Sequence, residues 1–194
     1  TSVGEVATGF NVRGGGVDQN LVLYDGIPVF NISHVFGFFS SFNSDALKEV
    51  NFYRGGIPAE YGGRVSSVLN ITAKEGSFQK WEGNGGIGAI SSNFTVGGPI
   101  VKDKTSVIAS LRSSYSDWIL NTIKTDYQDI QNSTVYFYDG SLKLSHQFSN
   151  KTKLQFTGYM SKDKFGISTD TVYRWFNRMG VLRLDHSFND KQRE

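Results

Sequence analysis

The feature that most constrains the fold is an alternation of apolar and polar side chains in the second half of the sequence. From Tyr136 to Phe148 the even positions are mostly apolar and the odd positions mostly polar, and residues 153–161 continue the pattern. Successive side chains of a β-strand point to opposite faces of the sheet, so this period of two predicts strands with one apolar and one polar face. The polar run from Ser149 to Thr152 predicts a tight hairpin turn between them.

A seven-residue motif repeats within this half of the chain. LKLSHQF at 142–148 recurs as LRLDHSF at 182–188, which is a period of 40 residues. Two strands with one short and one longer connection fill such a period, and every second strand then returns to the same end with the same face outward. The repeat predicts an up-and-down meander. With further strands expected at 81–96 and 105–120, we count five strands, too few to close a barrel.

Up to Gly76 the sequence has short β-type runs separated by glycine-rich turns. Strands are expected at 20–24, 49–53 and 67–72. A short helix is expected from Ser44 to Glu49, with Ser44 as its N-cap. The sequence therefore predicts a small α+β unit over residues 1–76, followed by antiparallel strands over residues 77–194.

Composition and motifs argue against several classes of function. Lys and Arg total 20 against 18 Asp and Glu, a net charge of +2, which does not favour nucleic acid as a partner. The absence of cysteine excludes thiolate metal sites, and the three histidines are too scattered for a zinc site. The motif GNGGIG at 83–88 matches a dinucleotide-binding pattern, but β-like residues follow it instead of a helix. We expect no cofactor, no metal and no enzymatic activity.

The apolar face of the predicted strands requires either lipid or a second sheet. Aromatic residues gather at both ends of the strands, as the two interfaces of a membrane require; they are Phe148 and Phe188 at one end and Trp118, Tyr136, Tyr138 and Trp175 near the other. This pattern favours a membrane barrel. The alternative is a soluble, surface-exposed β-rich module that binds carbohydrate through Trp and Tyr faces. The first requires detergent for solubility, whereas the second would be a soluble monomer.

Three glycine- and aromatic-rich segments carry a family resemblance. FNVRGGGVDQNLVLYDGIPV at 10–29, SHVFGFFS at 33–40 and YRGGIPAEYGGRVSSVLNI at 53–71 resemble the plug domain of TonB-dependent outer-membrane receptors. The HVFG motif at 34–37 resembles the Bacteroidetes-type members of that family. The strands after Gly76 are similar to the opening of the family's barrel.

The resemblance implies an α+β plug domain followed by antiparallel β-strands of an incomplete transmembrane β-barrel, which in complete receptors has about 22 strands. It implies location in the bacterial outer membrane, with the barrel in lipid and the plug inside its lumen. The implied function is import of a small nutrient, namely a siderophore, a vitamin, an oligosaccharide or a peptide, with the plug as gate. The implied partner is TonB, acting through a segment absent from this chain, and a lipoprotein lid is a further candidate.

The resemblance also assigns candidate ligand-binding residues. Residues 28–42 would form the outward-facing apical loop of the plug, where a ligand would meet Asn31, His34, Phe36 and Phe38. The alternative is that these side chains pack inside the plug or against the barrel wall.

Two glycine-flanked arginines are candidates for contacts between plug and barrel. Arg13 and Arg64 resemble the plug arginines that form charge-assisted hydrogen bonds with carboxylates of the barrel wall. The alternative is that both are solvated turn residues.

Overall fold

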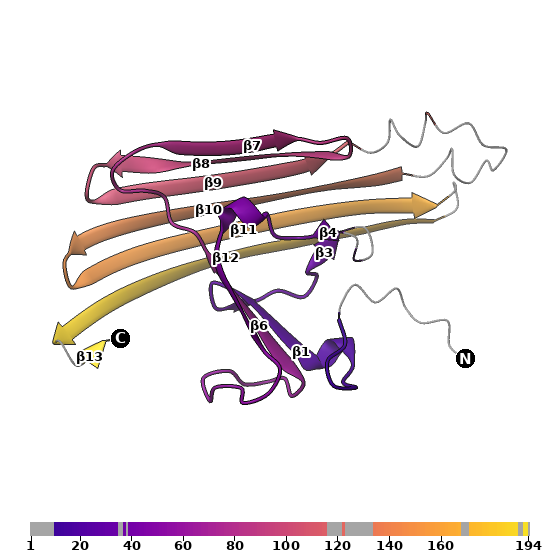
Figure 1. Ribbon diagram of the computed structural model, residues 1–194, viewed down its shortest axis with the longest axis horizontal. Coiled ribbons are helices and arrows are strands. Elements are labelled where there is room, and N and C mark those ends of the chain that lie inside the picture. Colours follow the sequence, from indigo (N-terminus) through magenta and orange to yellow (C-terminus); the bar gives the residue numbers. More distant parts are fainter. Residues whose placement is uncertain are drawn as a thin grey trace.

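The computed structural model describes residues 10–34, 37, 39–115, 122, 134–167, 171–189 and 192–193. Within them, a four-stranded sheet with the order β2-β1-β6-β5 lies on one side of a larger seven-stranded sheet (Figure 1). We call the described part of residues 10–76 the N-terminal unit and the larger sheet the meander sheet.

The N-terminal unit is built from short elements. Its strands are β1 (Asn20–Tyr24), β2 (Ile27–Pro28), β3 (Ser33–His34), β4 (Phe39–Ser40), β5 (Leu47–Tyr53) and β6 (Ser67–Ala73), and its helical turns include η1 (Val17–Gln19) and η3 (Ser44–Ala46). β1 runs parallel to β6, whereas β3 and β4 form a separate two-stranded ribbon. The strands predicted at 20–24, 49–53 and 67–72 are confirmed.

The predicted helix at Ser44–Glu49 is wrong in length and in its cap. Only a 3-10 turn, η3, forms, and Asn43 caps it by accepting a hydrogen bond from the Asp45 amide at 3.2 Å. From Leu47 the chain is extended, because β5 pairs with β6 and this pairing satisfies the backbone groups that a helix would otherwise satisfy.

The meander sheet is antiparallel throughout, and neighbours along the chain are neighbours in the sheet, which confirms the predicted meander. Its strands are β7 (Glu82–Ile87), β8 (Ser91–Val101), β9 (Thr105–Ser114), β10 (Thr134–Ser149), β11 (Thr152–Ile167), β12 (Thr171–Asn189) and β13 (Gln192–Arg193). The count of five strands is wrong. Residues 81–96 were expected as one strand but form the β7–β8 hairpin, and the short β13 follows β12.

The alternation of side chains separates the two faces of the meander sheet as predicted. One transverse row, read from the strand register, consists of Val107, Leu144, Phe156 and Leu182, and the adjacent row on the opposite face consists of Ser106, Ser145, Gln155 and Arg183. The apolar face is exposed, and Leu182 keeps 68 % of its surface. The polar face is the one against which the N-terminal unit packs.

The aromatic positions at the strand ends are confirmed in part. Phe148 and Phe188 are exposed on the apolar face, 62 % and 61 %, at equivalent ends of β10 and β12. Trp175 lies instead on the polar face, because it pairs with Asp163 in the register of β11 and β12. Trp118 lies outside the described residues.

The connection between the two sheets passes very close to the meander sheet at Gly76. A Cβ atom at this position would lie 2.1 Å from the carbonyl oxygen of Val107 on β9. Only glycine fits there, because the obstructing atoms belong to the backbone.

Among the described residues, no helix is long and apolar enough to cross a membrane.

Candidate functional site

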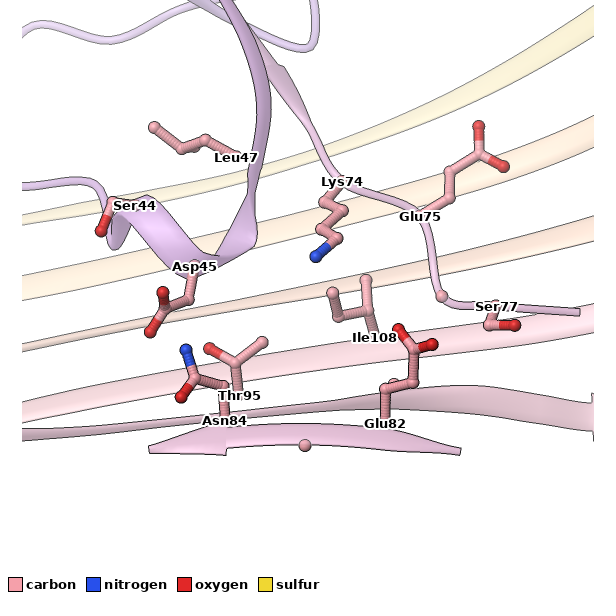
Figure 2. A pocket seen from close by; sticks show the side chains of 13 residues that line it. Ser44, Asp45, Leu47, Lys74, Glu75, Ser77, Glu82, Asn84, Thr95 and Ile108 are labelled. Atoms are coloured by element: carbon pink, nitrogen blue, oxygen red, sulfur yellow. The ribbon is translucent and has the colours of Figure 1, made fainter. Parts of the chain in front are cut away.

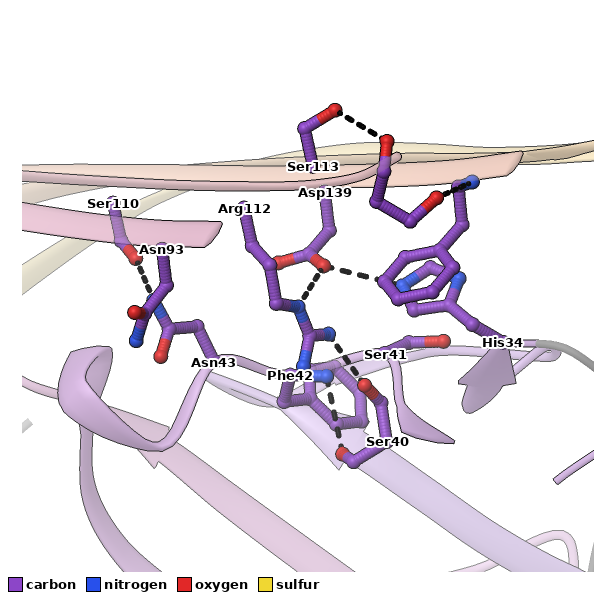
Figure 3. Close-up of polar contacts among 12 residues, drawn as sticks. His34, Ser40, Ser41, Phe42, Asn43, Asn93, Ser110, Arg112, Ser113 and Asp139 are labelled. Atoms are coloured by element: carbon purple, nitrogen blue, oxygen red, sulfur yellow. Dashed lines mark hydrogen bonds and ion pairs between the residues drawn. The ribbon is translucent and has the colours of Figure 1, made fainter. Parts of the chain in front are cut away.

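The candidate site is the polar contact between the N-terminal unit and the meander sheet. Side chains from β8 to β12 meet the loops and helical turns of the N-terminal unit through hydrogen bonds and ion pairs. Figure 3 shows the contacts that come from β8, β9 and β10. Its main parts are a cluster around His34, a buried ion pair at Asp25 and an amide contact at Asn43.

His34 lies between two carboxylates of the meander sheet. Its Nδ1 is 2.9 Å from both carboxylate oxygens of Asp163, and its Nε2 is 3.2 Å from Oδ2 of Asp139. The ring stacks on Phe137, with 4.3 Å between ring centroids. His34 and Phe137 are fully buried. The histidine therefore joins β3 to β10 and β11.

Arg112 on β9 completes this cluster. Its Nε donates to Asp139 Oδ2 at 2.6 Å, and its Nη2 donates to the carbonyl oxygen of Ser40 on β4 (Figure 3). Burial by itself lowers the pKa of His34, but the hydrogen bonds and charges of Asp139 and Asp163 outweigh it and raise this pKa above its ordinary value of 6.5. The two carboxylates therefore stabilise the imidazolium form of His34 relative to an ordinary histidine.

A second polar contact centres on the turn that follows β1. Asp25 has a φ of 48°, and its Oδ1 accepts a hydrogen bond from the amide of Ala73 at 2.8 Å. Its Oδ2 accepts from Lys143 Nζ at 2.9 Å and from Thr157 Oγ1 at 2.6 Å. The Asp25 and Lys143 side chains are less than one tenth exposed. This carboxylate thus joins the ends of β1 and β6 to β10 and β11.

Asn43 caps η3 and also reaches the meander sheet. Its Nδ2 donates to Ser110 Oγ at 2.7 Å, and that hydroxyl also accepts from Thr95 Oγ1 at 2.9 Å. Asp45, two residues later, accepts from Asn93 Nδ2 at 2.9 Å. The same short turn is therefore fixed to both β8 and β9.

A small apolar cluster accompanies these polar contacts. Tyr159 of β11 packs with Tyr24 and Phe42, at ring-centroid distances of 5.4 and 5.5 Å, and its hydroxyl donates to the carbonyl of Ser41 at 2.7 Å. Burial raises the pKa of Tyr24 to about 12, so its phenol stays protonated at neutral pH. Tyr159 thus makes a residue of the meander sheet part of the core of the N-terminal unit.

A cavity of about 320 Å³ lies near the start of the meander sheet (Figure 2). It is lined by η3, by residues 74–77 of the segment that connects the two sheets, and by β7–β9. Asp45, Lys74, Glu75 and Glu82 contribute charged side chains to its lining. Glu75 is also held from β11, because Lys153 Nζ and Gln155 Nε2 donate to its two oxygens at 2.6 and 2.7 Å. Among the described residues, no group of three or more His, Asp or Glu side chains is arranged to hold a metal ion.

The candidate ligand-binding residues Asn31 and His34 have different surroundings in the structure. Asn31 is partly exposed, and its carbonyl oxygen accepts from Asn177 Nδ2 of β12 at 3.1 Å. His34 is buried against Asp139, Asp163 and Phe137 of the meander sheet. Phe36 and Phe38 lie outside the described residues. Binding of a ligand by these four residues stays a prediction.

Arg13 and Arg64 are exposed side chains of the N-terminal unit. Arg13 has a φ of 50° and lies in a groove of about 480 Å³ with Arg54 and Gly55, and all residues that line this groove belong to the N-terminal unit. Arg64 donates to the carbonyl of Gly63 at 3.0 Å. Their pairing with a barrel wall stays a prediction.

Sequence reasoning missed the charged residues that hold the two sheets together. Arg112, Asp139 and Lys143 lie on strands predicted correctly, and Asp139 and Lys143 belong to the polar set of the alternation. That alternation identifies their face but not their partners in the N-terminal unit, which are far away in sequence: His34 is 105 residues from Asp139, and Asp25 is 118 from Lys143.

Residues 1–68 match the family model described as the TonB-dependent receptor plug domain. No curated protein matches the sequence at a significant level.

Solved structures of siderophore receptors share the fold. The siderophore receptor PirA from Pseudomonas aeruginosa matches with a TM-score of 0.65 and 21 % identity over 92 % of this chain and 31 % of its own. PirA from Acinetobacter baumannii matches with a TM-score of 0.60 and 20 % identity over 82 % of this chain and 26 % of its own. P. aeruginosa FpvA, in complex with a heterologous pyoverdine and iron, matches with a TM-score of 0.59 and 16 % identity over 94 % of this chain and 26 % of its own. The chain thus spans less than a third of the length of these receptors.

Proposed function

We propose that this chain is part of a TonB-dependent outer-membrane receptor that imports a small nutrient. In this proposal residues 1–76 belong to the plug and residues 77–194 form the first strands of a transmembrane β-barrel that encloses it. The proposal rests on the match of residues 1–68 to the plug model, on the shared fold with siderophore receptors, and on the two faces of the meander sheet.

The observation that carries the proposal is the difference in polarity and exposure between those two faces. The exposed face is apolar, and the covered face is polar and holds the N-terminal unit. A membrane barrel requires this arrangement, because its outer surface meets hydrocarbon and its interior is polar. A soluble sandwich would require a second sheet against the apolar face.

The contacts at the site suit a gate. They are separate hydrogen bonds and ion pairs spread over several strands, such as Asn43 with Ser110 on β9 and Asp25 with Lys143 on β10 and Thr157 on β11. Each can yield separately when a partner pulls on the plug, while together they seal it. We infer transport and not catalysis, with TonB as the pulling partner, outer-membrane lipid around the barrel and a lipoprotein lid as a further partner in a Bacteroidetes-type receptor.

For the ligand we propose a siderophore, a vitamin, an oligosaccharide or a peptide, met at the apical loop that contains Asn31, His34, Phe36 and Phe38. We also propose that Arg13 and Arg64 pair with carboxylates of the barrel wall.

An uptake experiment tests this proposal. Cells with and without the protein are given labelled ferrichrome, cobalamin, maltoheptaose or trialanine as probes of the four ligand classes. We expect protein-dependent accumulation of one probe, which stops when the membrane potential is dissipated. A protein that is a soluble monomer in detergent-free buffer and supports accumulation of none of the probes would contradict the proposal.

A further inference from the structure

The His34 cluster contacts both strands of the short β3–β4 ribbon. His34 belongs to β3, and Ser40, whose carbonyl accepts from Arg112, belongs to β4. Among the described residues, the register pairs of the ribbon are Ser33 with Ser40 and His34 with Phe39, and the Ser41 amide donates to the Ile32 carbonyl at 2.9 Å. The attachment of this ribbon to the sheet therefore depends strongly on the cluster.

When Asp139 and Asp163 are both ionised, the hydrogen bonds of His34 need a proton on each of its ring nitrogens. Nδ1 faces Asp163 and Nε2 faces Asp139, and an ionised carboxylate can only accept. Neutral imidazole has one donor and one acceptor nitrogen, so it would turn a lone pair toward one of the two carboxylates. Only imidazolium donates to both.

Charge balance leads to the same requirement. The charged and titratable groups that face His34 are Asp139 from β10 and Asp163 from β11, with Arg112 from β9 reaching Asp139, while Phe137 covers the ring face. Two carboxylates and one guanidinium leave one negative charge uncompensated. The exposed fractions of the Asp139 and Asp163 side chains are 3 % and 4 %, so water does little to stabilise that charge.

We propose that His34 is a proton-dependent latch, which fixes the β3–β4 ribbon to the wall of the meander sheet when it is protonated and loosens the ribbon when it loses its proton. The latch concerns how the β3–β4 ribbon is held, and it goes beyond the proposed import function. The Asp25–Lys143 contact contains no histidine and therefore serves as an internal reference.

Hydrogen exchange of the protein in detergent, measured between pH 6 and pH 9 and corrected for the intrinsic pH dependence of exchange, tests the latch. The readout is the protection of the amides of residues 33–34 and 40–41. Between the ordinary histidine pKa of 6.5 and the raised pKa in the folded protein, we expect protection to fall about tenfold for each pH unit and to level off above it. Amides of β1 should show no such fall.

Two variants separate the latch from a merely structural role of the same side chains. His34→Gln cannot titrate, so its ribbon should be weakly protected at pH 6 and independent of pH. Asp163→Asn offers an amide donor to a neutral imidazole, so protection should persist to high pH. His146→Gln is the matched control, because His146 lies on the apolar face beside Thr105, and it should keep the wild-type profile.

A flat wild-type profile would overturn the proposal, and so would a wild-type profile retained in Asp163→Asn. Should His34→Gln fail to fold, the wild-type and Asp163→Asn profiles still decide. None of these measurements depends on uptake, so the latch and the import function can fail separately.

Discussion

Asp25 Oδ2 and Lys143 Nζ lie 2.9 Å apart, although 118 residues separate them in sequence. The pair is buried, and Thr157 donates to the same carboxylate oxygen. One side chain thus binds a turn of the N-terminal unit to two neighbouring strands of the meander sheet, β10 and β11.

We expect Lys143→Met to lower the free energy of unfolding by about 3–5 kcal/mol, because it leaves a buried carboxylate without its cation. Urea unfolding in detergent measures this. The matched control is Arg183→Met: Arg183 pairs with Asp185 at 3.1 Å but is 67 % exposed, so its loss should cost at most about 1 kcal/mol. Equal losses in the two variants would contradict a buried ion pair at Asp25.

Gly76→Ala should destabilise the protein by about 1–3 kcal/mol. The added Cβ would meet the Val107 carbonyl at 2.1 Å, and the backbone must move to relieve the clash. Gly62→Ala is a suitable control, because a Cβ there has no neighbour within 4 Å and the backbone φ lies outside the glycine-favouring range. Thermal unfolding compares the two, and an unchanged midpoint in Gly76→Ala would show that the close passage over β9 is not rigid.

Phe137→Ala should cost about 3–5 kcal/mol, because this fully buried ring packs against both His34 and Phe39. The control is Phe148→Ala on the same strand, which removes a ring that is 62 % exposed on the other face. We expect protease resistance of the N-terminal unit to fall in the first variant only. A comparable fall in both would mean that Phe137 does not anchor the unit.

The stability contribution of His34 should depend on pH with a definite sign. Because its pKa is raised in the folded protein, the contribution is fully present below the ordinary pKa of 6.5 and decreases as pH rises through the folded pKa. The difference in unfolding free energy between wild type and His34→Gln should therefore be larger at pH 6 than at pH 9. A difference that grows with pH would indicate that neutral imidazole is the bound form.

Local patterns in the sequence were sufficient to predict the two faces of β10–β12, although they did not resolve the β7–β8 hairpin. The period of two in residues 136–148 and the repeat at 182–188 depend only on how side chains alternate along a strand, and the structure confirms both. Trp175 lies outside these motifs, and only the register of β11 and β12 shows that it shares the polar face with Asp163.

The contacts between the two parts could not be predicted in the same way. Ser44 has the residue type of an N-cap, but Asn43 caps the turn instead. Its Oδ1 accepts from the Asp45 amide while its Nδ2 donates to Ser110 on β9. For His34 the sequence left open contact with a ligand or packing against neighbouring side chains, and it did not indicate the two carboxylates of β10 and β11 that enclose the ring. Such pairings depend on how a folded unit packs on a sheet, and the alternation of side chains along a strand does not predict them.

The most direct test of the proposed barrel compares two adjacent positions of β12. The 194 residues contain no cysteine, so Leu182→Cys and Arg183→Cys can each carry a single nitroxide label in protein reconstituted into lipid vesicles. Collision rates with oxygen, which concentrates in hydrocarbon, and with a water-soluble nickel chelate are measured by electron paramagnetic resonance. We expect the label at 182 to favour oxygen and the label at 183 to favour the nickel chelate. Preferential collision of the label at 182 with the nickel chelate would contradict a lipid-facing apolar surface.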